Sequence, residues 1–218
     1  MKDGKITLSK RSIALFDNCM SELDVWHFKA INSVLLVEQL AFCKESYLGE
    51  YVLGEGLEKI DDMEGYAIAA ICNKQKMDSV SEEIAKKVSE TVSQEDIEDE
   101  SQGEEITEEH ETSIMFKDEE GEIHTYAVED DFIDILDKMI EFCTEKGVTV
   151  FEPVHILAAM FAAEDEELKS LFEDMELSFK KAKEFFTSEK AFRMGIVPYA
   201  LSGFMSCLND KVNVEKPC

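Results

Sequence analysis

Histidine side chains are the groups in this 218-residue chain best suited to acid–base chemistry or metal binding near neutral pH. His155 lies in the apolar stretch "FEPVHILAAMF", and no Cys, Asp or Ser stands beside it in the spacing of a catalytic pair. We therefore interpret His155 as a buried structural histidine with satisfied ring nitrogens. His110 and His124 lie among carboxylates, where chance proximity to acidic groups is expected, and "EEHETS" is not the zinc-binding pattern H-E-x-x-H.

The carboxylates and thiols also lack the spacings that metal sites and nucleophiles need. The run "EDIEDESQGEE" does not follow the D-x-[DN]-x-[DN]-G pattern of a calcium loop, which favours a solvated acidic loop. No G-x-S-x-G occurs, and no C-x-x-C pair or nearby cation activates any of the cysteines Cys19, Cys43, Cys72, Cys143, Cys207 and Cys218. The sequence thus predicts no catalytic, cofactor-binding or metal-binding residue and no cofactor, and the unpaired thiols favour a cytoplasmic protein.

The charge and hydropathy of the chain exclude some classes of partner. The formal net charge is −27, so a phosphate backbone would be repelled and nucleic-acid binding is not expected. Residues 78–122 hold about 18 acidic and about 3 basic side chains, which is more than half of the acidic excess. Apolar residues form neither a membrane-spanning run nor an export signal after "MKDGKITLSKRS", so no membrane partner is expected.

An internal repeat is the strongest signal of organisation along the chain. A shift of 120 positions, which places Ser33 on Pro153, aligns apolar positions over about 45 residues without a gap. The aligned pairs include Ile13 with Ile133, Phe16 with Leu136, Val34 with Val154, Leu36 with Ile156, Leu40 with Met160, and Leu48 with Leu168. Within each copy the apolar spacing is helical, which predicts an all-α fold made of two similar sets of helices.

Capping residues and glycines give the expected bounds of these helices. Ser9 is a suitable N-cap, Ser33 and Pro153 each open the second helix of their copy, and Gly147 supplies a left-handed stop. The first copy is expected to hold helices over residues 9–23, from 33 onward, over 46–53 and over 58–74. The second copy is expected to hold helices over residues 130–146, 153–163, 165–175 and 178–186.

The sequence between the copies, and the sequence after them, has a different character. Residues 94–112 are too acidic and too poor in apolar side chains to bury a face, so we expect a mobile loop. The next stretch, "IMFKDEEGEIHTYAV", alternates apolar and polar residues around Glu120-Gly121, which predicts a short β-hairpin. The chain's last part is expected to dock on a partner, because a short terminal helix cannot bury all of Phe185, Phe186, Phe192, Tyr199 and Phe204.

These residues resemble the amino-terminal domain of Clp-type AAA+ unfoldases, the ClpA, ClpB and ClpC group. In that domain each repeat has a helix that opens with Thr or Pro, followed by Glu, His and a leucine-rich run. Here "PVHILAAM" keeps Pro153, His155, Ile156 and Leu157, whereas "SVLLVEQL" keeps Ser33, Leu36 and Val37 with Leu35 at the histidine position. The resemblance covers about residues 9–72 and 129–186, and the tail from Val197 to Pro217 looks like the linker before an ATPase module.

The resemblance implies a tandem repeat of four-helix units related by a pseudo-two-fold axis. Residues 1–186 would form this double-repeat domain, with repeat 1 at about 9–74, the acidic insert and hairpin at about 75–128, and repeat 2 at about 129–186. Residues 187–218 would be a linker toward an ATPase module. The acidic insert and the hairpin lie outside the common form of the domain.

The function implied is reception of unfolded or tagged client proteins and of adaptor proteins for a Clp-type ATPase ring. No G-x-x-x-x-G-K-[ST] loop is present, so this chain is not expected to be an enzyme by itself. Val34 and Val154 stand where the ClpC branch uses glutamate to recognise phosphorylated arginine, so that ligand is not expected. A free-standing adaptor or regulatory module built from the same repeat is the alternative.

Overall fold

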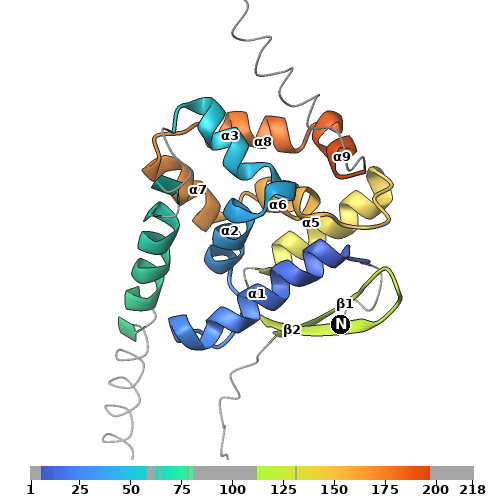
Figure 1. Ribbon diagram of the computed structural model, residues 1–218, viewed down its shortest axis with the longest axis horizontal. Coiled ribbons are helices and arrows are strands. Elements are labelled where there is room, and N and C mark those ends of the chain that lie inside the picture. Colours follow the sequence, from blue (N-terminus) through green and yellow to red (C-terminus); the bar gives the residue numbers. More distant parts are fainter. Residues whose placement is uncertain are drawn as a thin grey trace, which may run out of the picture.

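Helices make up most of the described chain, together with one small antiparallel sheet (Figure 1). The computed structural model describes residues 6–57, 62–63, 65–77, 79–80, 112–130 and 132–196. For residues 194–196 it describes the backbone but not the side chains. No helix among these residues is both long and apolar enough to span a membrane. The helices are α1 (Lys10–Trp26), α2 (Ser33–Phe42), η1 (Lys44–Ser46), α3 (Leu48–Glu55), α5 (Phe132–Glu145), α6 (Pro153–Ala163), α7 (Glu166–Asp174), α8 (Phe179–Phe186) and α9 (Glu189–Ile196), and residues 65–77 are also helical.

The helix starts follow from local capping. Ser9 caps α1 by accepting a hydrogen bond from the Ser12 backbone N–H at 3.3 Å. α2 begins at Ser33 as expected, and Asn32 is its cap, accepting from the Leu35 N–H at 3.0 Å. Pro153 opens α6, where its missing N–H costs nothing, and Gly147 has the expected left-handed φ of 67° after α5. The predicted starts at residues 33 and 153 are therefore confirmed.

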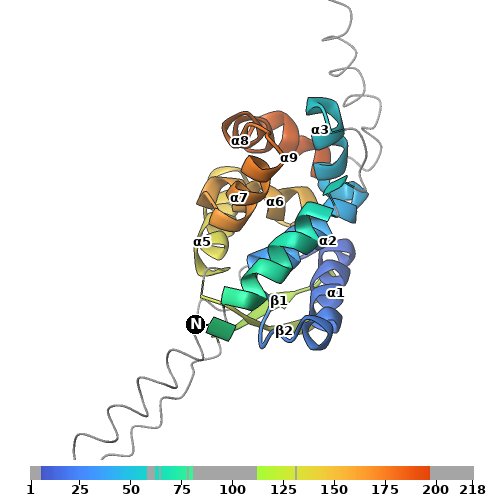
Figure 2. The same ribbon diagram turned by 90° about the vertical axis from the view of Figure 1, so that its left-hand side faces the viewer.

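Two helices are apolar on nearly every side and form the centre of the molecule. α2 and α6 lie in the middle in both views, with α3, α8 and α9 on one side and the hairpin on the other (Figures 1 and 2). A helix that is apolar all round must be covered on all sides. The buried side chains of α6 are Pro153, Val154, His155, Ile156, Leu157, Ala158, Ala159, Met160 and Phe161.

The predicted β-hairpin is confirmed. β1 (Thr112–Lys117) pairs antiparallel with β2 (Ile123–Val128), and Gly121 in the turn has a φ of 87°. Residues outside the hairpin form single β-bridges with both of its edges. Thr7 pairs with Lys117 of β1, and Ile31 pairs with Val128 of β2. The hairpin is thus fixed along parts of both edges, which limits its exposed edge hydrogen-bonding groups.

Aromatic side chains attach the hairpin to the helices. The ring of Phe16 in α1 has its centroid 5.2 Å from that of Phe116, 5.1 Å from that of Tyr126 and 5.7 Å from that of Phe132. The Tyr126 hydroxyl also donates to Asp17 at 2.9 Å. The hairpin is therefore part of the core, because two of its side chains complete a cluster that starts on α1 and α5.

The sequence predicts a mobile loop over residues 94–112 and a linker from residue 187. The expected mobile loop 94–112 lies outside the described residues, except that Thr112 already belongs to β1. Within the stretch expected to be a linker from residue 187, residues 189–196 form α9. Phe186 and Phe192 are buried at 0% and 5% exposure, so the core of the chain covers two of the five aromatic rings considered for a partner surface. Tyr199 and Phe204 lie outside the described residues.

The packing of the hairpin gives a first prediction. Phe116 is 1% exposed, and replacing it by alanine should lower the free energy of unfolding by about 3–5 kcal/mol, because removal of the buried ring creates a cavity. Ile123 lies in the same hairpin at 63% exposure, so Ile123→Ala should change it by less than about 0.5 kcal/mol. Urea unfolding of both variants measures the difference. Equal losses would show that the hairpin is not part of the core.

Candidate functional site

His155 occupies the third position of α6 and is 1% exposed. Its Nδ1 accepts a hydrogen bond from the Glu152 backbone N–H at 3.1 Å. Its Nε2 lies 3.0 Å from the carbonyl oxygen of Phe192, to which the Nε2–H donates. The imidazole also stacks on the Phe192 ring with centroids 5.5 Å apart. Both ring nitrogens are used, so the interpretation of His155 as a satisfied structural histidine is confirmed.

The position of His155 fixes its charge state. Burial lowers the pKa of His155, and hydrogen bonding with the Phe192 and Val150 backbones offsets this in part. The neutral ring is also required by geometry, because a proton on Nδ1 would face the Glu152 N–H, and two donors would then oppose each other. His155 therefore links the start of α6 to α9 only in its neutral form.

Three thiols of the described chain are poorly placed for nucleophilic chemistry. Cys19 is fully buried, and this burial raises the pKa of its thiol. Burial likewise raises the pKa of Cys43 to about 11 and that of Cys143 above its ordinary value. These three thiols are protonated near neutral pH, which removes the nucleophilic form.

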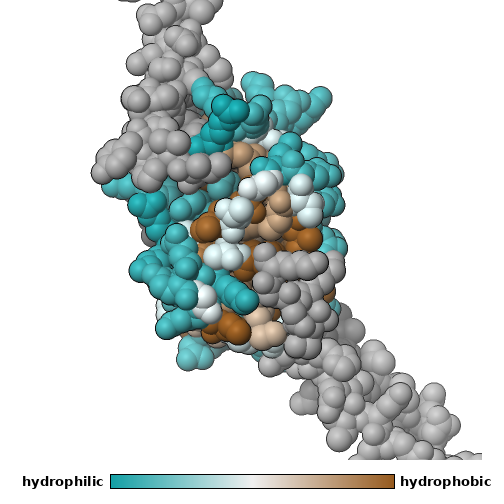
Figure 3. Space-filling model, turned by 90° about the vertical axis from the view of Figure 1, so that its right-hand side faces the viewer, coloured by the Kyte–Doolittle hydropathy of each residue, from teal (hydrophilic) through white to brown (hydrophobic). Residues whose placement is uncertain are grey.

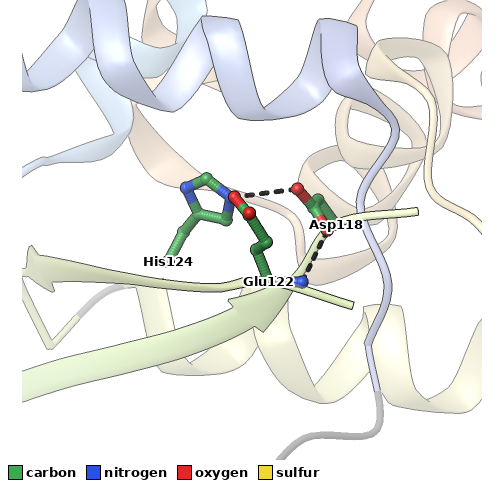
Figure 4. A group of neighbouring side chains, drawn as sticks. All are labelled: Asp118, Glu122 and His124. Atoms are coloured by element: carbon green, nitrogen blue, oxygen red, sulfur yellow. Dashed lines mark hydrogen bonds and ion pairs between the residues drawn. The ribbon is translucent and has the colours of Figure 1, made fainter. Parts of the chain in front are cut away.

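One group of titratable side chains is brought together at the turn of the hairpin (Figure 4). Asp118, Glu122 and His124 each offer a ligand atom, and these atoms lie within 4.8 Å of one another. Burial alone would raise the pKa of Asp118, but hydrogen bonds from the Glu122 N–H and the His124 ring lower it. From the sequence, carboxylates near His124 were expected by chance. The signal missed was that the hairpin turn brings residue 118, which follows β1, close to residue 124 of β2. His110 lies outside the described residues.

Several large apolar side chains of the described chain remain exposed to solvent. They are Met20, Val25, Phe42, Leu53, Tyr66, Ile68, Met77, Val80, Ile123 and Ile133. The most exposed of them besides Ile123 are Val25 of α1 at 67%, Met77 at 71% and Val80 at 55%. Met77 and Val80 lie at the end of the helix that contains residues 65–77 or just after it.

A pocket of about 530 Å³ lies between the end of α1 and the end of the helix that contains residues 65–77. We call it the Trp26 pocket. It is lined by Trp26, His27, Phe28, Gln75, Lys76, Ser79 and Val80.

The end of α1 builds one wall of the Trp26 pocket. The helix stops at Trp26 because His27 adopts a left-handed φ of 57°, and the Phe28 N–H then donates to the Leu23 carbonyl at 3.0 Å. The Gln75 side chain donates to the Trp26 carbonyl, and the Trp26 indole donates to Glu22 at 3.2 Å. These hydrogen bonds hold the wall in place, so the pocket is formed in advance of any ligand.

Apolar side chains also gather on another face of the molecule. Figure 3 shows this face from the right of Figure 1, with a central apolar area bordered by hydrophilic side chains. It is the side on which α9 lies in Figure 1. The described part of the molecule thus presents apolar surface in more than one place, although the chain has a net negative charge.

The environment of His155 predicts a pH effect on stability. Because the folded-state pKa is lowered, the unfolded chain takes up the proton first, so stability is full above about pH 6.5 and is lost as the pH falls from there toward the lowered value. His155→Gln keeps an acceptor for the Glu152 N–H and does not titrate. The wild type should lose up to about 1.4 kcal/mol per pH unit more than this variant in urea unfolding between pH 7.5 and 5. Parallel pH profiles would contradict the neutral, buried assignment.

Comparison of the chain with protein-family models, with curated proteins and with solved structures found no match. An account of function therefore depends on the residues and the geometry described above.

Proposed function

We propose that the chain is a protein-binding domain of the Clp amino-terminal type, which receives unfolded clients or adaptors for a protein-unfolding ring. The observation that carries the proposal is the agreement between the helix bounds and the 120-residue repeat of the sequence. α2 begins at residue 33 and α6 at residue 153, an offset of 120. α1 ends at residue 26 and α5 at 145, an offset of 119, and α3 begins at 48 and α7 at 166, an offset of 118.

Burial at equivalent positions supports two similar units. In five pairs of residues 120 positions apart, both members are 3% exposed or less. These pairs are Val34 with Val154, Leu35 with His155, Leu36 with Ile156, Val37 with Leu157, and Leu40 with Met160. The pair of Leu35 and His155 is informative, because one unit fills with leucine the position that the other fills with histidine. A role for this position in packing accounts for both residues.

The two sets of helices pack against each other. α2 contacts α7 of the second set, and α6 contacts η1 of the first set. Tyr51 in α3 also joins the two sets, since its ring centroid lies 6.5 Å from that of Phe172 in α7 and 5.2 Å from that of Phe186 in α8. Two units related in this way share one core rather than forming two separate domains.

The surface of the molecule favours clients that are apolar and basic. The Trp26 pocket offers an aromatic wall and the exposed side chain of Val80, and the net charge of −27 attracts cationic segments. Docking need not be tight, because several copies tethered to one ring raise the effective concentration of a client. A free-standing adaptor could use the same pocket without such a ring.

Binding at the Trp26 pocket can be measured directly, because Trp26 is the only tryptophan of the chain. A short peptide rich in leucine and arginine and without tryptophan should change the emission of Trp26 in a saturable way. A matched peptide with serine in place of leucine should not. Val80→Ser should weaken binding about fivefold, because it removes part of the buried apolar area.

A second apolar residue provides the control for this experiment. Ile123 is 63% exposed and lies on the hairpin, outside the residues that line the pocket, so Ile123→Ser should leave the affinity within about twofold. Equal effects of the two serine variants, or no response of Trp26 to the peptide, would contradict the proposed binding site.

The proposal and its alternative differ in how the chain acts. As a receptor, the chain should restore client unfolding when it is fused to a Clp-type ring that lacks its own amino-terminal domain, and it should do little when added unfused. A free-standing adaptor should act when added unfused. If neither form changes unfolding although the peptide binds, the assignment to a Clp-type machine is wrong and the binding activity remains.

A further inference from the structure

The turn of the hairpin holds three side chains of metal-ligating type in fixed positions. Asp118 follows β1, Glu122 precedes β2, and His124 is the second residue of β2 (Figure 4). The Glu122 N–H donates to Asp118 Oδ1 at 2.8 Å, and the Asp118 N–H donates to the Glu122 carbonyl at 3.0 Å. These two bonds set Asp118 and Glu122 opposite each other, and the strand pairing then fixes His124 beside them.

The separations of these side chains match those of ligands that share one ion. His124 Nε2 lies 3.4 Å from Asp118 Oδ2, which is long for a hydrogen bond between a ring nitrogen and a carboxylate. Two ligands bound at about 2.1 Å to one tetrahedral zinc ion are about 3.4 Å apart. All three ligand atoms lie within 4.8 Å of one another, so small side-chain rotations bring the third atom to the same distance.

We propose that Asp118, Glu122 and His124 bind one divalent transition-metal ion, for which zinc is the test ion. The site goes beyond the proposed client binding, because it lies on the hairpin and shares no residue with the Trp26 pocket. It also departs from the expectation of no metal residue, since that expectation used linear motifs and these ligands are assembled by strand pairing.

The donor set determines the choice of ion. An imidazole nitrogen with two carboxylate oxygens suits zinc and its neighbours, whereas calcium and magnesium prefer oxygen ligands throughout. Three protein ligands leave a fourth position for water. A surface pocket of about 400 Å³ lies over the same turn and provides room for that water, and its lining residues are Lys10, Ile13, Asp118, Glu120 and Glu122.

Lys10 modulates the site. Its Nζ pairs with Glu120 Oε1 at 2.6 Å at the rim of the same pocket. A fixed positive charge there competes with a metal cation for the field of the nearby carboxylates. Removal of the Lys10 charge should therefore tighten metal binding, whereas loss of a ligand should weaken it.

Zinc titration of the full chain by calorimetry tests the proposal, with the ring protons of the four histidines followed by NMR. The wild type should bind one zinc ion in a step that shifts the His124 resonances and that excess magnesium does not displace. His124→Gln and Glu122→Gln should each weaken this step at least tenfold. Lys10→Met should strengthen it about threefold.

A control variant that removes the same charge from a neighbouring residue distinguishes a specific metal site from general attraction of the cation to acidic side chains. Glu119 lies in the same turn but is not one of the three grouped residues, so Glu119→Gln removes the same charge as Glu122→Gln and should leave affinity within about twofold. If Glu119→Gln and Glu122→Gln weaken binding equally, or if His124→Gln has no effect, the ion is attracted by charge alone and the proposed site is wrong. Circular dichroism of each variant establishes that the hairpin and helices are retained.

Discussion

The burial of α2 and α6 is the constraint on which the rest of the structure depends. Both helices are apolar on nearly all sides, so each must be covered completely before the chain can gain stability from them. α1, α7 and α3 cover α2, and α5, α8 and α9 cover α6. The hairpin covers the other side of α1 through Phe116 and Tyr126. No single element of this arrangement would be stable alone, which is why one core serves both sets of helices.

His155 shows how such a core accommodates a polar group. Its two ring nitrogens form hydrogen bonds with the start of α6 and with the backbone of α9. Across the described part of the chain, no buried side-chain nitrogen or oxygen lacks a hydrogen-bond partner. The histidine therefore adds a hydrogen bond to α9 that leucine could not form. As a consequence, the packing of α9 depends on a neutral imidazole ring.

Sequence reasoning succeeded where the signal was local. Pro153 and Gly147 mark helix ends through backbone properties of one residue, and the alternation around Gly121 defines the hairpin without reference to other elements. It did not predict α9, because the Phe192 ring packs on Phe142 and His155, which are distant from it in the sequence. The Trp26 pocket and the group at Asp118 were likewise not predictable, because each requires the pairing of segments whose relative positions only the folded chain determines.

Native-state hydrogen exchange of the backbone amides tests most directly the claim that α2 and α6 form one shared core. If they do, the slowest amides of both helices should exchange only by global unfolding and should report the same free energy, while amides at the hairpin turn exchange faster. If the amides of α2 exchange at a free energy well below that of α6, the two sets of helices unfold separately. The account of a single core built around two central helices would then be wrong.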